Sequence, residues 1–373
     1  PAIPAIPGKK TKPVSPQSAT TCANSPQLSV FSLLDPNWSI SNPQPVIDNA
    51  YTYYYYIEDM LKSRSGAIFA AGFKYGIPGW ISVVHKSTDN GLTWKSIELS
   101  DASSGWSFIY SMVEDKNGAI YAAGTKLWKS LDDGNTWSVV PVPMLDVYWG
   151  GTLPITNLIV TNDNSLVASF TFTEGYLSGS LSMSYSYSKV YKSVDGGNNW
   201  TELFTYNPIP KLASHISSIV EANDGSLIFR DYYGGSESGV YRYSGGGVIT
   251  KTFTDYAFAK EPNAGLLKGR DGSLYIIAVD KAINLDAIDY TQPGNALLAA
   301  YHSKDNGITW TKLGTLPNSW NIQGSMIEDV YGALYTASHS VCDEKSSIYK
   351  SADKGTIWNQ IATSPQFGTS SET

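Results

Sequence analysis

The sequence predicts an all-β protein folded as a single six-bladed β-propeller of four-stranded antiparallel blades, with seven blades as the alternative. Three observations lead to this prediction. One eight-residue pattern occurs five times, a strand–turn–strand pattern occurs six times, and the composition is rich in turn and aromatic residues, with 33 Gly, 25 Tyr and 11 Trp. Internal repetition of this kind is the signature of an architecture built from equivalent units.

The eight-residue pattern, called a box below, is Ser-x-Asp-x-Gly-x-x-Trp. Its copies span residues 87–94, 130–137, 193–200, 303–310 and 351–358. Asp and Gly fit a tight reversal, because the carboxylate accepts bonds from nearby N–H groups and glycine tolerates positive φ. We therefore expect a structural role in the turn for Asp89, Asp132, Asp195, Asp305 and Asp353. Aromatic and lysine columns alternate just before each box, as in a half-buried strand.

The second pattern precedes each box and consists of an apolar strand, a polar turn and a strand of small residues. Its anchors are 46 to 61 residues apart, at Gly66, Gly118, Asn164, Gly225, Gly272 and Gly332. There are therefore six units but five boxes, because the fourth unit has a run of three glycines at Gly245–Gly247 where its box should be. Each unit has the length of one four-stranded blade.

The chain divides into a flexible leader over residues 1–25, a propeller domain over 26–365 and a tail over 366–373. The blades are expected at about 53–100, 108–143, 155–207, 216–256, 264–317 and 322–363. Residues 28–41 look like a shortened strand–turn–strand in which Asp35 and Trp38 echo a degenerate box. We expect this piece to form an N-terminal closing element, or else part of a seventh blade.

The boxes resemble the Asp-box, or bacterial neuraminidase, repeat of sialidase-like β-propellers. In that family the box is the turn between the third and fourth strands of a blade, so the resemblance implies the fold. Its sialidases hold the substrate carboxylate with three arginines and carry an Arg-Ile-Pro motif. This chain has no Arg-Ile-Pro, and two of its four arginines, Arg64 and Arg270, are expected in turns between first and second strands. We therefore assign no catalytic residue.

Composition excludes several classes of function. The net charge is −7 and no basic run is present, which argues against nucleic acid and anionic membranes as partners. No apolar run approaches the roughly 20 residues that a membrane helix needs. The four histidines show no metal-ligand spacing. We expect a monomer that needs no cofactor and no metal.

The two cysteines, Cys22 and Cys342, lie in the first and last parts of the chain, which a propeller brings together. A disulfide between them is expected, with two free thiols as the alternative. The composition is typical of an exported protein, so we expect an extracellular, periplasmic or cell-surface location.

The strand order predicts two unlike faces. Acidic residues recur near the 1–2 turns, beginning with Glu58-Asp59 and Glu114-Asp115, and a residue demanded by every blade is interpreted as turn chemistry. The 2–3 loops, including residues 171–188, and the 4–1 connections form the opposite face. They differ from blade to blade, and variable loops on a rigid scaffold are where function is expected.

Aromatic residues on this loop face suggest a binding site, because their rings cover apolar faces while polar neighbours bind hydroxyl groups. The candidate ligand-binding residues are Trp80, Trp106, Tyr148, Trp149, Arg230, Tyr232 and Trp320. The predicted function is non-catalytic binding of a glycan or a protein partner. One alternative is a glycoside hydrolase whose carboxylate pair would come from Glu174, Asp231, Asp146, Asp255 and Asp286. Another is an assembly scaffold.

Overall fold

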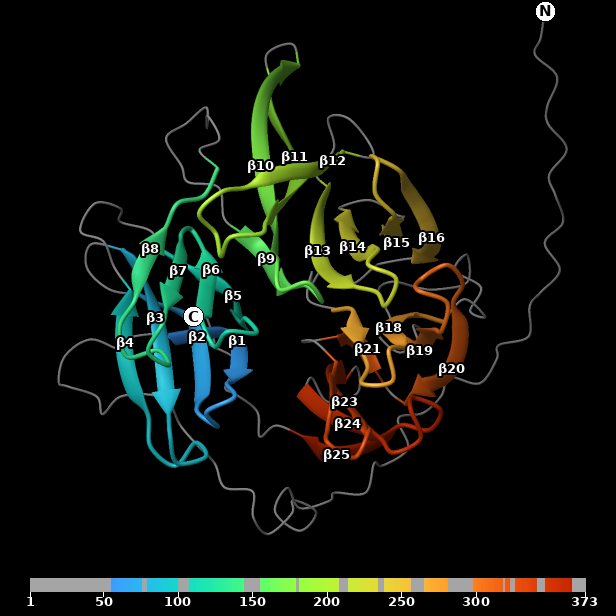
Figure 1. Cartoon of the computed structure of the whole chain (residues 1–373). Coiled ribbons are helices and arrows are strands. Elements are labelled where there is room, and N and C mark those ends of the chain that lie inside the picture. The colour runs from blue at the N-terminus through green and yellow to red at the C-terminus, as the bar shows by residue number, and fades with distance from the viewer. Residues whose placement is uncertain are drawn as a thin grey trace, which may run out of the picture.

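The fold was analysed in a computed structural model. It describes residues 55–75, 79–99, 107–143, 155–178, 181–207, 214–233, 238–255, 265–280, 298–317, 319–322, 326–340 and 346–363. These residues form six antiparallel sheets arranged as the blades of a propeller (Figure 1). The predicted fold class is therefore confirmed. The leader, the closing element, the tail and both cysteines, Cys22 and Cys342, lie outside the described residues.

The first three blades each run in chain order from an inner to an outer strand. Blade 1 contains β1 (Tyr55–Lys62), β2 (Ile68–Tyr75), β3 (Trp80–Ser87) and β4 (Lys95–Leu99). Blade 2 contains β5 (Ile109–Glu114), β6 (Ile120–Gly124), β7 (Leu127–Ser130) and β8 (Ser138–Val140). Blade 3 contains β9 (Ile155–Val160), β10 (Leu166–Ser178), β11 (Leu181–Ser193) and β12 (Thr201–Tyr206).

The last three blades follow the same order, and the inner strand of blade 6 comes in two pieces. Blade 4 contains β13 (Ser214–Glu221), β14 (Leu227–Tyr233), β15 (Ser238–Tyr243) and β16 (Ile249–Asp255). Blade 5 contains β17 (Leu267–Lys268), β18 (Leu274–Val279), β19 (Leu298–Ser303) and β20 (Thr311–Leu316). Blade 6 contains β21 (Ser319–Ile322), β22 (Ile327–Glu328), β23 (Leu334–Ser340), β24 (Ser346–Ser351) and β25 (Asn359–Thr363).

Each box forms the turn between the third and fourth strands. In blade 2, Asp132 Oδ1 accepts bonds from Ser130 Oγ at 2.8 Å and from Thr136 N at 2.8 Å, and Oδ2 accepts one from Thr136 Oγ1 at 2.6 Å. Ser130 Oγ in turn accepts a bond from Gly134 N at 2.8 Å. The same pattern of bonds to Ser and to the backbone recurs in the other boxes. The box aspartates thus satisfy the polar groups of a turn.

These bonds predict how the box aspartates respond to acid. The Thr136 hydroxyl and backbone N–H, with Ser130, lower the pKa of Asp132 from its ordinary 3.8 to about 2. A carboxyl whose pKa is depressed by folding stabilises the native state above pH ~4, and this contribution is lost as the pH falls toward ~2. We expect an Asp132→Asn variant to have a lower melting temperature at pH 6 and a smaller further drop between pH 4 and 2. Carbon-13 NMR titration of the carboxyl groups checks the cause, and a midpoint near 3.8 for Asp132 would contradict it.

Blade 4 replaces the box with a glycine turn. Gly245, Gly246 and Gly247 have φ values of 94°, 62° and 80°, which side chains rarely adopt. Val248 N donates to Gly245 O at 3.2 Å and closes the turn. Three glycines thus make the reversal between β15 and β16 without the side-chain bonds of a box.

The core lies between the blades rather than within them. Among the described residues, each of five buried apolar clusters joins two consecutive blades. Equivalent positions on the third strands of blades 1 to 5 face the next blade and are 0% exposed, namely Val84, Leu127, Val190, Val240 and Ala300. Each blade therefore buries its apolar face only when a following element covers it.

A ring of hydrogen bonds links the 1–2 turns on the box side. In each of blades 1 to 5, the second residue of the turn donates its backbone N–H to a side chain of the next blade. The pairs are Arg64 to Glu114 at 2.8 Å, Lys116 to Asn164 at 2.6 Å, Asn162 to Glu221 at 2.6 Å, Asn223 to Asn306 at 3.2 Å, and Arg270 to Glu328 at 2.6 Å. Glu114 and its counterparts are therefore structural acceptors.

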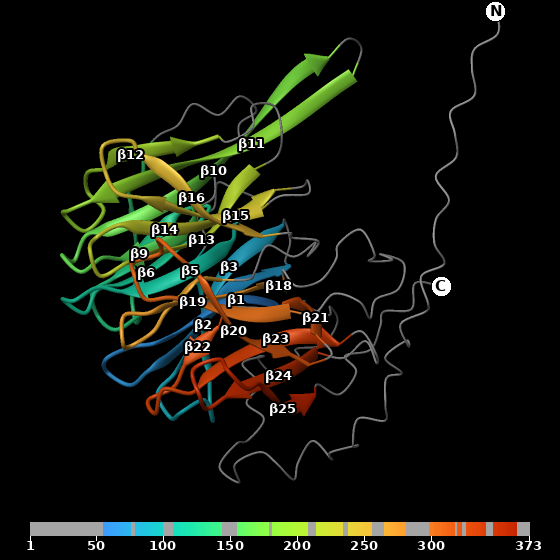
Figure 2. The same cartoon turned by 90° about the vertical axis from the view of Figure 1, so that its right-hand side faces the viewer.

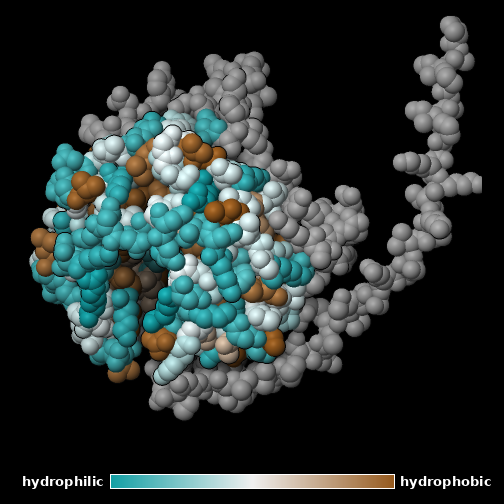
Figure 3. Space-filling view, turned by 45° about the vertical axis from the view of Figure 1, so that its right-hand side comes forward, coloured by the Kyte–Doolittle hydropathy of each residue, from teal (hydrophilic) through white to brown (hydrophobic). Residues whose placement is uncertain are grey.

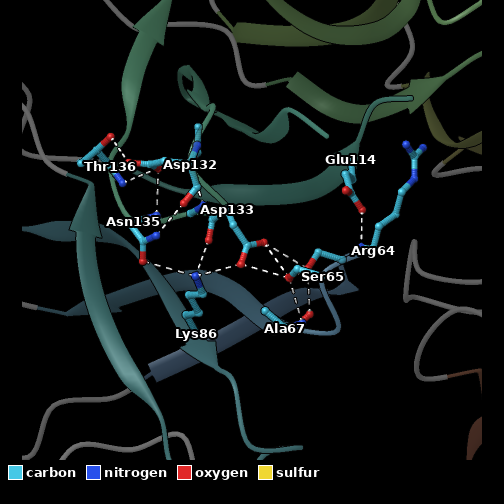
Figure 4. Close-up of polar contacts among 12 residues, drawn as sticks. Arg64, Ser65, Ala67, Lys86, Glu114, Asp132, Asp133, Asn135 and Thr136 are labelled. Carbon is cyan, nitrogen blue, oxygen red and sulfur yellow. Dashed lines mark hydrogen bonds and ion pairs between the residues drawn. The ribbon is translucent and has the colours of Figure 1, made fainter. Parts of the chain in front are cut away.

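Cations on third strands add a second link between blades. Lys86 Nζ reaches the blade 2 box, where it donates to the carbonyl of Asp133 and lies 3.1 Å from its carboxylate (Figure 4). Lys129 and Arg242 make the equivalent bond to the carbonyls of Gly196 and Asn306. Lys192 precedes the blade without a box, and it instead pairs with Asp163 of its own blade at 2.8 Å.

Two expected loops are regular structure. Glu58 and Asp59 lie within β1 rather than in the 1–2 turn, because Asp59 lies seven positions before Gly66 whereas Asp115 lies three positions before Gly118. Residues 171–188, expected to be a 2–3 loop, are mostly strand. β10 and β11 pair in register from Leu166↔Ser193 to Ser178↔Leu181 and extend beyond the other blades (Figure 2).

Candidate functional site

Four aromatic side chains gather where blades 1 and 2 meet on the loop face. We call Phe73, Trp80, Phe108 and Tyr110 the aromatic cluster. The Phe73 ring meets Trp80 and Phe108 edge-on, with centroids 5.2 and 4.8 Å apart. The Phe108 ring stacks on Tyr110 at 6.0 Å and lies tilted 6.3 Å from Trp80. All four side chains are half-buried, so each keeps some surface open to solvent.

The local sequence holds this cluster in place. Ser107 N donates to the carbonyl of Trp80 at 2.9 Å, and Phe108 N donates to Thr125 Oγ1 at 3.2 Å. Gly124 allows the close approach, because a Cβ there would lie 1.9 Å from Phe108 O. The start of β5 is therefore fixed against both β3 and β6. Phe73, Trp80 and Tyr110 therefore lie on strands, and Phe108 directly precedes β5.

Bulges in the inner strands place further groups at the centre of the ring. The pairing register shifts between Ile57 and Asp59 in β1 and between Ile109 and Ser111 in β5, which leaves Glu58 and Tyr110 as the bulged residues. Bulges re-aim side chains and are frequent beside functional sites. The equivalent bulged positions in other blades are Thr156, Ser217 and Trp320. We call these five positions the bulge ring.

The charge of Glu58 affects the ionisation of Tyr110. Surrounding protein raises the pKa of Glu58 by removing water from its carboxylate, although the side chain itself is exposed. Burial also raises the pKa of Tyr110, and the charge of Glu58 raises it further. The carboxylate of Glu58 is thus accessible to solvent, but nearby protein atoms reduce its hydration. The pair offers one acceptor and one donor beside the aromatic cluster.

Other carboxylates toward the loop face are committed to structure. Asp231 is 3% exposed and accepts bonds from Tyr206 Oη at 2.6 Å and Gly239 N at 2.6 Å. Asp280 pairs with Lys312 at 2.6 Å. Asp59 accepts a bond from Met112 N of blade 2 at 2.7 Å. Burial raises the pKa of both Asp231 and Asp59. Of the possible pair members, Asp146 and Asp286 lie outside the described residues.

Only some of the predicted ligand-binding residues lie at the aromatic cluster or the bulge ring. Trp80 lies in the aromatic cluster, and the backbone of Trp320 lies at a bulge-ring position. Arg230 is 6% exposed and donates to Ile277 O of blade 5 at 3.0 Å, so it packs between blades instead of lying on the surface. Tyr232 lies in β14. Trp106, Tyr148 and Trp149 lie outside the described residues.

Sequence reasoning missed Glu58, Tyr110 and Phe108 as members of a site. Their spacing carried a usable signal, since in both β1 and β5 an isoleucine directly precedes the bulged position and a methionine lies two residues after it. Aligning blade 1 on its turn at Ser63–Gly66, rather than on its acidic pair, would have put Glu58 opposite Tyr110.

The described residues contain no group of three or more His, Cys, Asp and Glu that could hold a metal ion. No helix with the length and hydrophobicity of a membrane span occurs among them. The visible surface in Figure 3 is mostly hydrophilic, its hydrophobic residues stand apart from one another, and it is hollowed toward the middle of the ring.

Comparison with known proteins shows a likeness to other proteins in fold. No protein-family model matches the chain, and no curated protein matches it. A Dyadobacter fermentans protein of unknown function superposes with a TM-score of 0.51 at 15% identity, covering 81% of this chain and 91% of that one. A polysaccharide lyase of family PL25, an ulvan lyase bound to -[GlcA(1-4)Rha3S]-, superposes with a TM-score of 0.56 at 12% identity, covering 82% and 80%. The chain is thus a β-propeller, and at these identities the likeness concerns the fold alone.

Proposed function

We propose that this propeller binds a glycan without catalysing its cleavage, at the aromatic cluster and the bulge ring. The observation that carries the proposal is the half-exposed Trp80–Phe108 pair, with Phe108 stacked on Tyr110 and the charge of Glu58 acting on Tyr110. Sugar rings present apolar C–H faces and polar hydroxyl edges. A tilted aromatic pair suits the faces, and the Glu58 carboxylate and the Tyr110 hydroxyl suit the edges.

The chemistry of the bulge ring favours a glycan over a peptide. Its described side chains are a carboxylate, a phenol and two small hydroxyls, at Glu58, Tyr110, Thr156 and Ser217. Ser217 Oγ donates to Arg230 O at 3.2 Å and Thr156 Oγ1 lies 3.0 Å from Ser169 Oγ, and each oxygen can still accept a bond from a sugar hydroxyl. The ulvan lyase carries its saccharide on the same fold, so the architecture is compatible with such a ligand.

The carboxylates whose side chains the structure describes support a non-catalytic role; those of Asp146, Glu174, Asp255 and Asp286 are not among them. Glycoside hydrolysis uses two carboxyl groups about 5–10 Å apart on either side of the bond to be cleaved. Burial raises the pKa of Glu58, but Asp59 beside it in sequence is bonded to blade 2. Asp231 and Asp280 have structural partners. We also propose that the protein is exported and monomeric, as expected from its composition.

The binding proposal predicts a large effect at Trp80. A glycan array screened alongside chromogenic glycosides should give binding without turnover. Trp80→Ala should weaken the affinity for the best glycan at least about tenfold, which corresponds to about 1.4 kcal/mol, because it removes the stacking surface. Trp80→Phe should recover part of that loss. Isothermal titration calorimetry measures both variants against the native chain.

Leu131→Ala is the matched control, since Leu131 is 78% exposed on a box of the opposite face and should leave the affinity unchanged. Turnover of any glycoside that is lost in Glu58→Gln would replace this proposal with hydrolysis. Equal affinity in the Trp80→Ala variant and the native chain would place the site elsewhere.

A further inference from the structure

The junction between blade 6 and blade 1 differs from the other five. From blade 1 to blade 5 the inner strands of consecutive blades contact each other, in the pairs β1–β5, β5–β9, β9–β13 and β13–β17. Blades 5 and 6 are joined by a contact between β19 and β21. Among the described strands no comparable contact joins blade 6 to blade 1. The two ends of the ring of blades face each other in Figure 1. Any close packing at this junction must therefore involve residues outside the described strands.

The face that blade 6 turns away from blade 5 is incompletely covered. Ile348 occupies the position of Val84 and Ala300, and Tyr335 that of Tyr275, as the strand pairing shows. Ala300 and Tyr275 are 0% and 1% exposed beneath the following blade, whereas Ile348 and Tyr335 are only half-buried. Ile327 on the neighbouring strand is 61% exposed. An apolar face that is buried in every other blade is thus left open here.

Blade 1 presents an open apolar edge to the same junction. Leu61 packs into the cluster shared with blade 2. Met60 lies on the opposite face of β1 from Leu61, because successive residues of a strand alternate. Met60 is 60% exposed, and Ile57, opposite Gly72, is 40% exposed. Both sides of the junction therefore expose apolar side chains that folding normally removes from water.

The turn ring also stops at this junction. The residue before each 1–2 turn is an acceptor in blades 2, 4 and 6, at Glu114, Glu221 and Glu328. Blade 1 has Lys62 at that position, which cannot accept a bond from the backbone N–H of blade 6. The donor of blade 6 would belong to Val330, whose side chain is 69% exposed. Blade 1 thus lacks the glutamate acceptor that blades 2, 4 and 6 present to the preceding blade.

We propose that residues 28–41 of this chain fill the junction between blade 6 and blade 1. The described structure begins at Tyr55 in β1, on one side of the junction, so 54 residues precede it and need only a short connection to reach it. Residues 28–41 contain seven apolar residues, Leu28, Val30, Phe31, Leu33, Leu34, Trp38 and Ile40. They therefore supply the hydrophobic surface that both sides lack.

Trp38 fixes how the segment should lie. Box tryptophans pack on the preceding blade: Trp200 Nε1 donates to Pro141 O of blade 2 at 3.2 Å, and Trp310 Nε1 to Thr252 Oγ1 of blade 4 at 3.2 Å. Trp38 ends a box-like sequence, so the same rule directs it to blade 6, against Ile348 and Tyr335. This inference concerns the closure of the propeller and is independent of the proposed ligand.

Hydrogen–deuterium exchange of the full chain tests this inference. Amides of residues 28–41 should exchange at least about tenfold more slowly than those of residues 1–20, since protection follows burial and hydrogen bonding. Trp38→Ala and Ile348→Asp should each abolish that protection. Leu131→Asp, at a 78% exposed box position, is the control and should leave it unchanged.

Each outcome decides the matter. Unprotected exchange across residues 28–41 in the native chain would overturn the inference, and it would do so even if Ile348→Asp failed to fold. Protection that depends on protein concentration would also overturn it, because a second copy would then cover the face. Protection that Trp38→Ala removes while the amides of blades 2 to 4 keep their native rates supports it.

Discussion

Replacing Phe229 with alanine should lower the free energy of unfolding by about 3–5 kcal/mol, the usual loss for a buried phenylalanine. Phe229 is 0% exposed and lies between blades 3 and 4. Its ring contacts Phe204, Tyr206 and Tyr241 at centroid distances of 5.4, 5.0 and 5.4 Å. Because these rings belong to strands on both sides of the junction, the cavity cannot close without moving one blade relative to the other.

Urea unfolding monitored by far-ultraviolet circular dichroism measures this loss. Ile357→Ala is the control, since Ile357 is 61% exposed in a box turn and should change the stability by less than about 0.5 kcal/mol. A loss below about 1.5 kcal/mol for Phe229→Ala would mean that the junction between blades 3 and 4 adapts to the missing ring, contrary to the packing described above.

Replacing Gly124 with alanine should displace two members of the aromatic cluster, Phe108 and Tyr110. The added Cβ would lie 1.9 Å from Phe108 O and 2.8 Å from Ile109 Cα, and both are backbone atoms that a rotamer change cannot move. Overpacking of this kind costs about 1–3 kcal/mol. The start of β5 must shift, and Phe108 and Tyr110 shift with it. We expect a lower melting temperature and at least about tenfold weaker glycan binding.

Thr125→Ser is the control for Gly124→Ala, because it changes a neighbouring residue without adding an atom that would clash with β5. Serine keeps the hydroxyl that accepts the bond from Phe108 N at 3.2 Å and loses only a methyl group. It should therefore retain near-native binding. If Gly124→Ala retained native affinity while losing stability, the aromatic cluster would not be part of the binding site, and the two measurements together distinguish these cases.

The repeat made most of the fold predictable, because each box has the same local chemistry wherever it occurs. Ser130, Asp132, Gly134 and Thr136 bond to one another within one turn, so their roles follow from sequence spacing alone. The glycine turn of blade 4 is equally local, since Gly245–Gly247 need only positive φ. The resemblance to Asp-box propellers implied that the box lies between the third and fourth strands, and the strand order agrees.

The site could be predicted only in part, because its members meet through bulges and long-range contacts. Trp80 was identified from its place on a loop between strands. Glu58 was mistaken for a turn residue, since the acidic pair of blade 1 looks like that of blade 2 but lies four residues earlier in its strand. Arg230 looked available to a ligand until the packing of blades 4 and 5 placed it against Ile277.

The sequence by itself determined the six repeating units, the position of the turns and the face on which the loops vary. These properties follow from interactions between residues only a few positions apart. Tertiary structure alone decided that Glu58 lies near Tyr110, that Phe108 packs on Phe73 and that Arg230 is buried. Each of these depends on how neighbouring blades approach each other, and that approach is set by the packing of side chains distant in sequence.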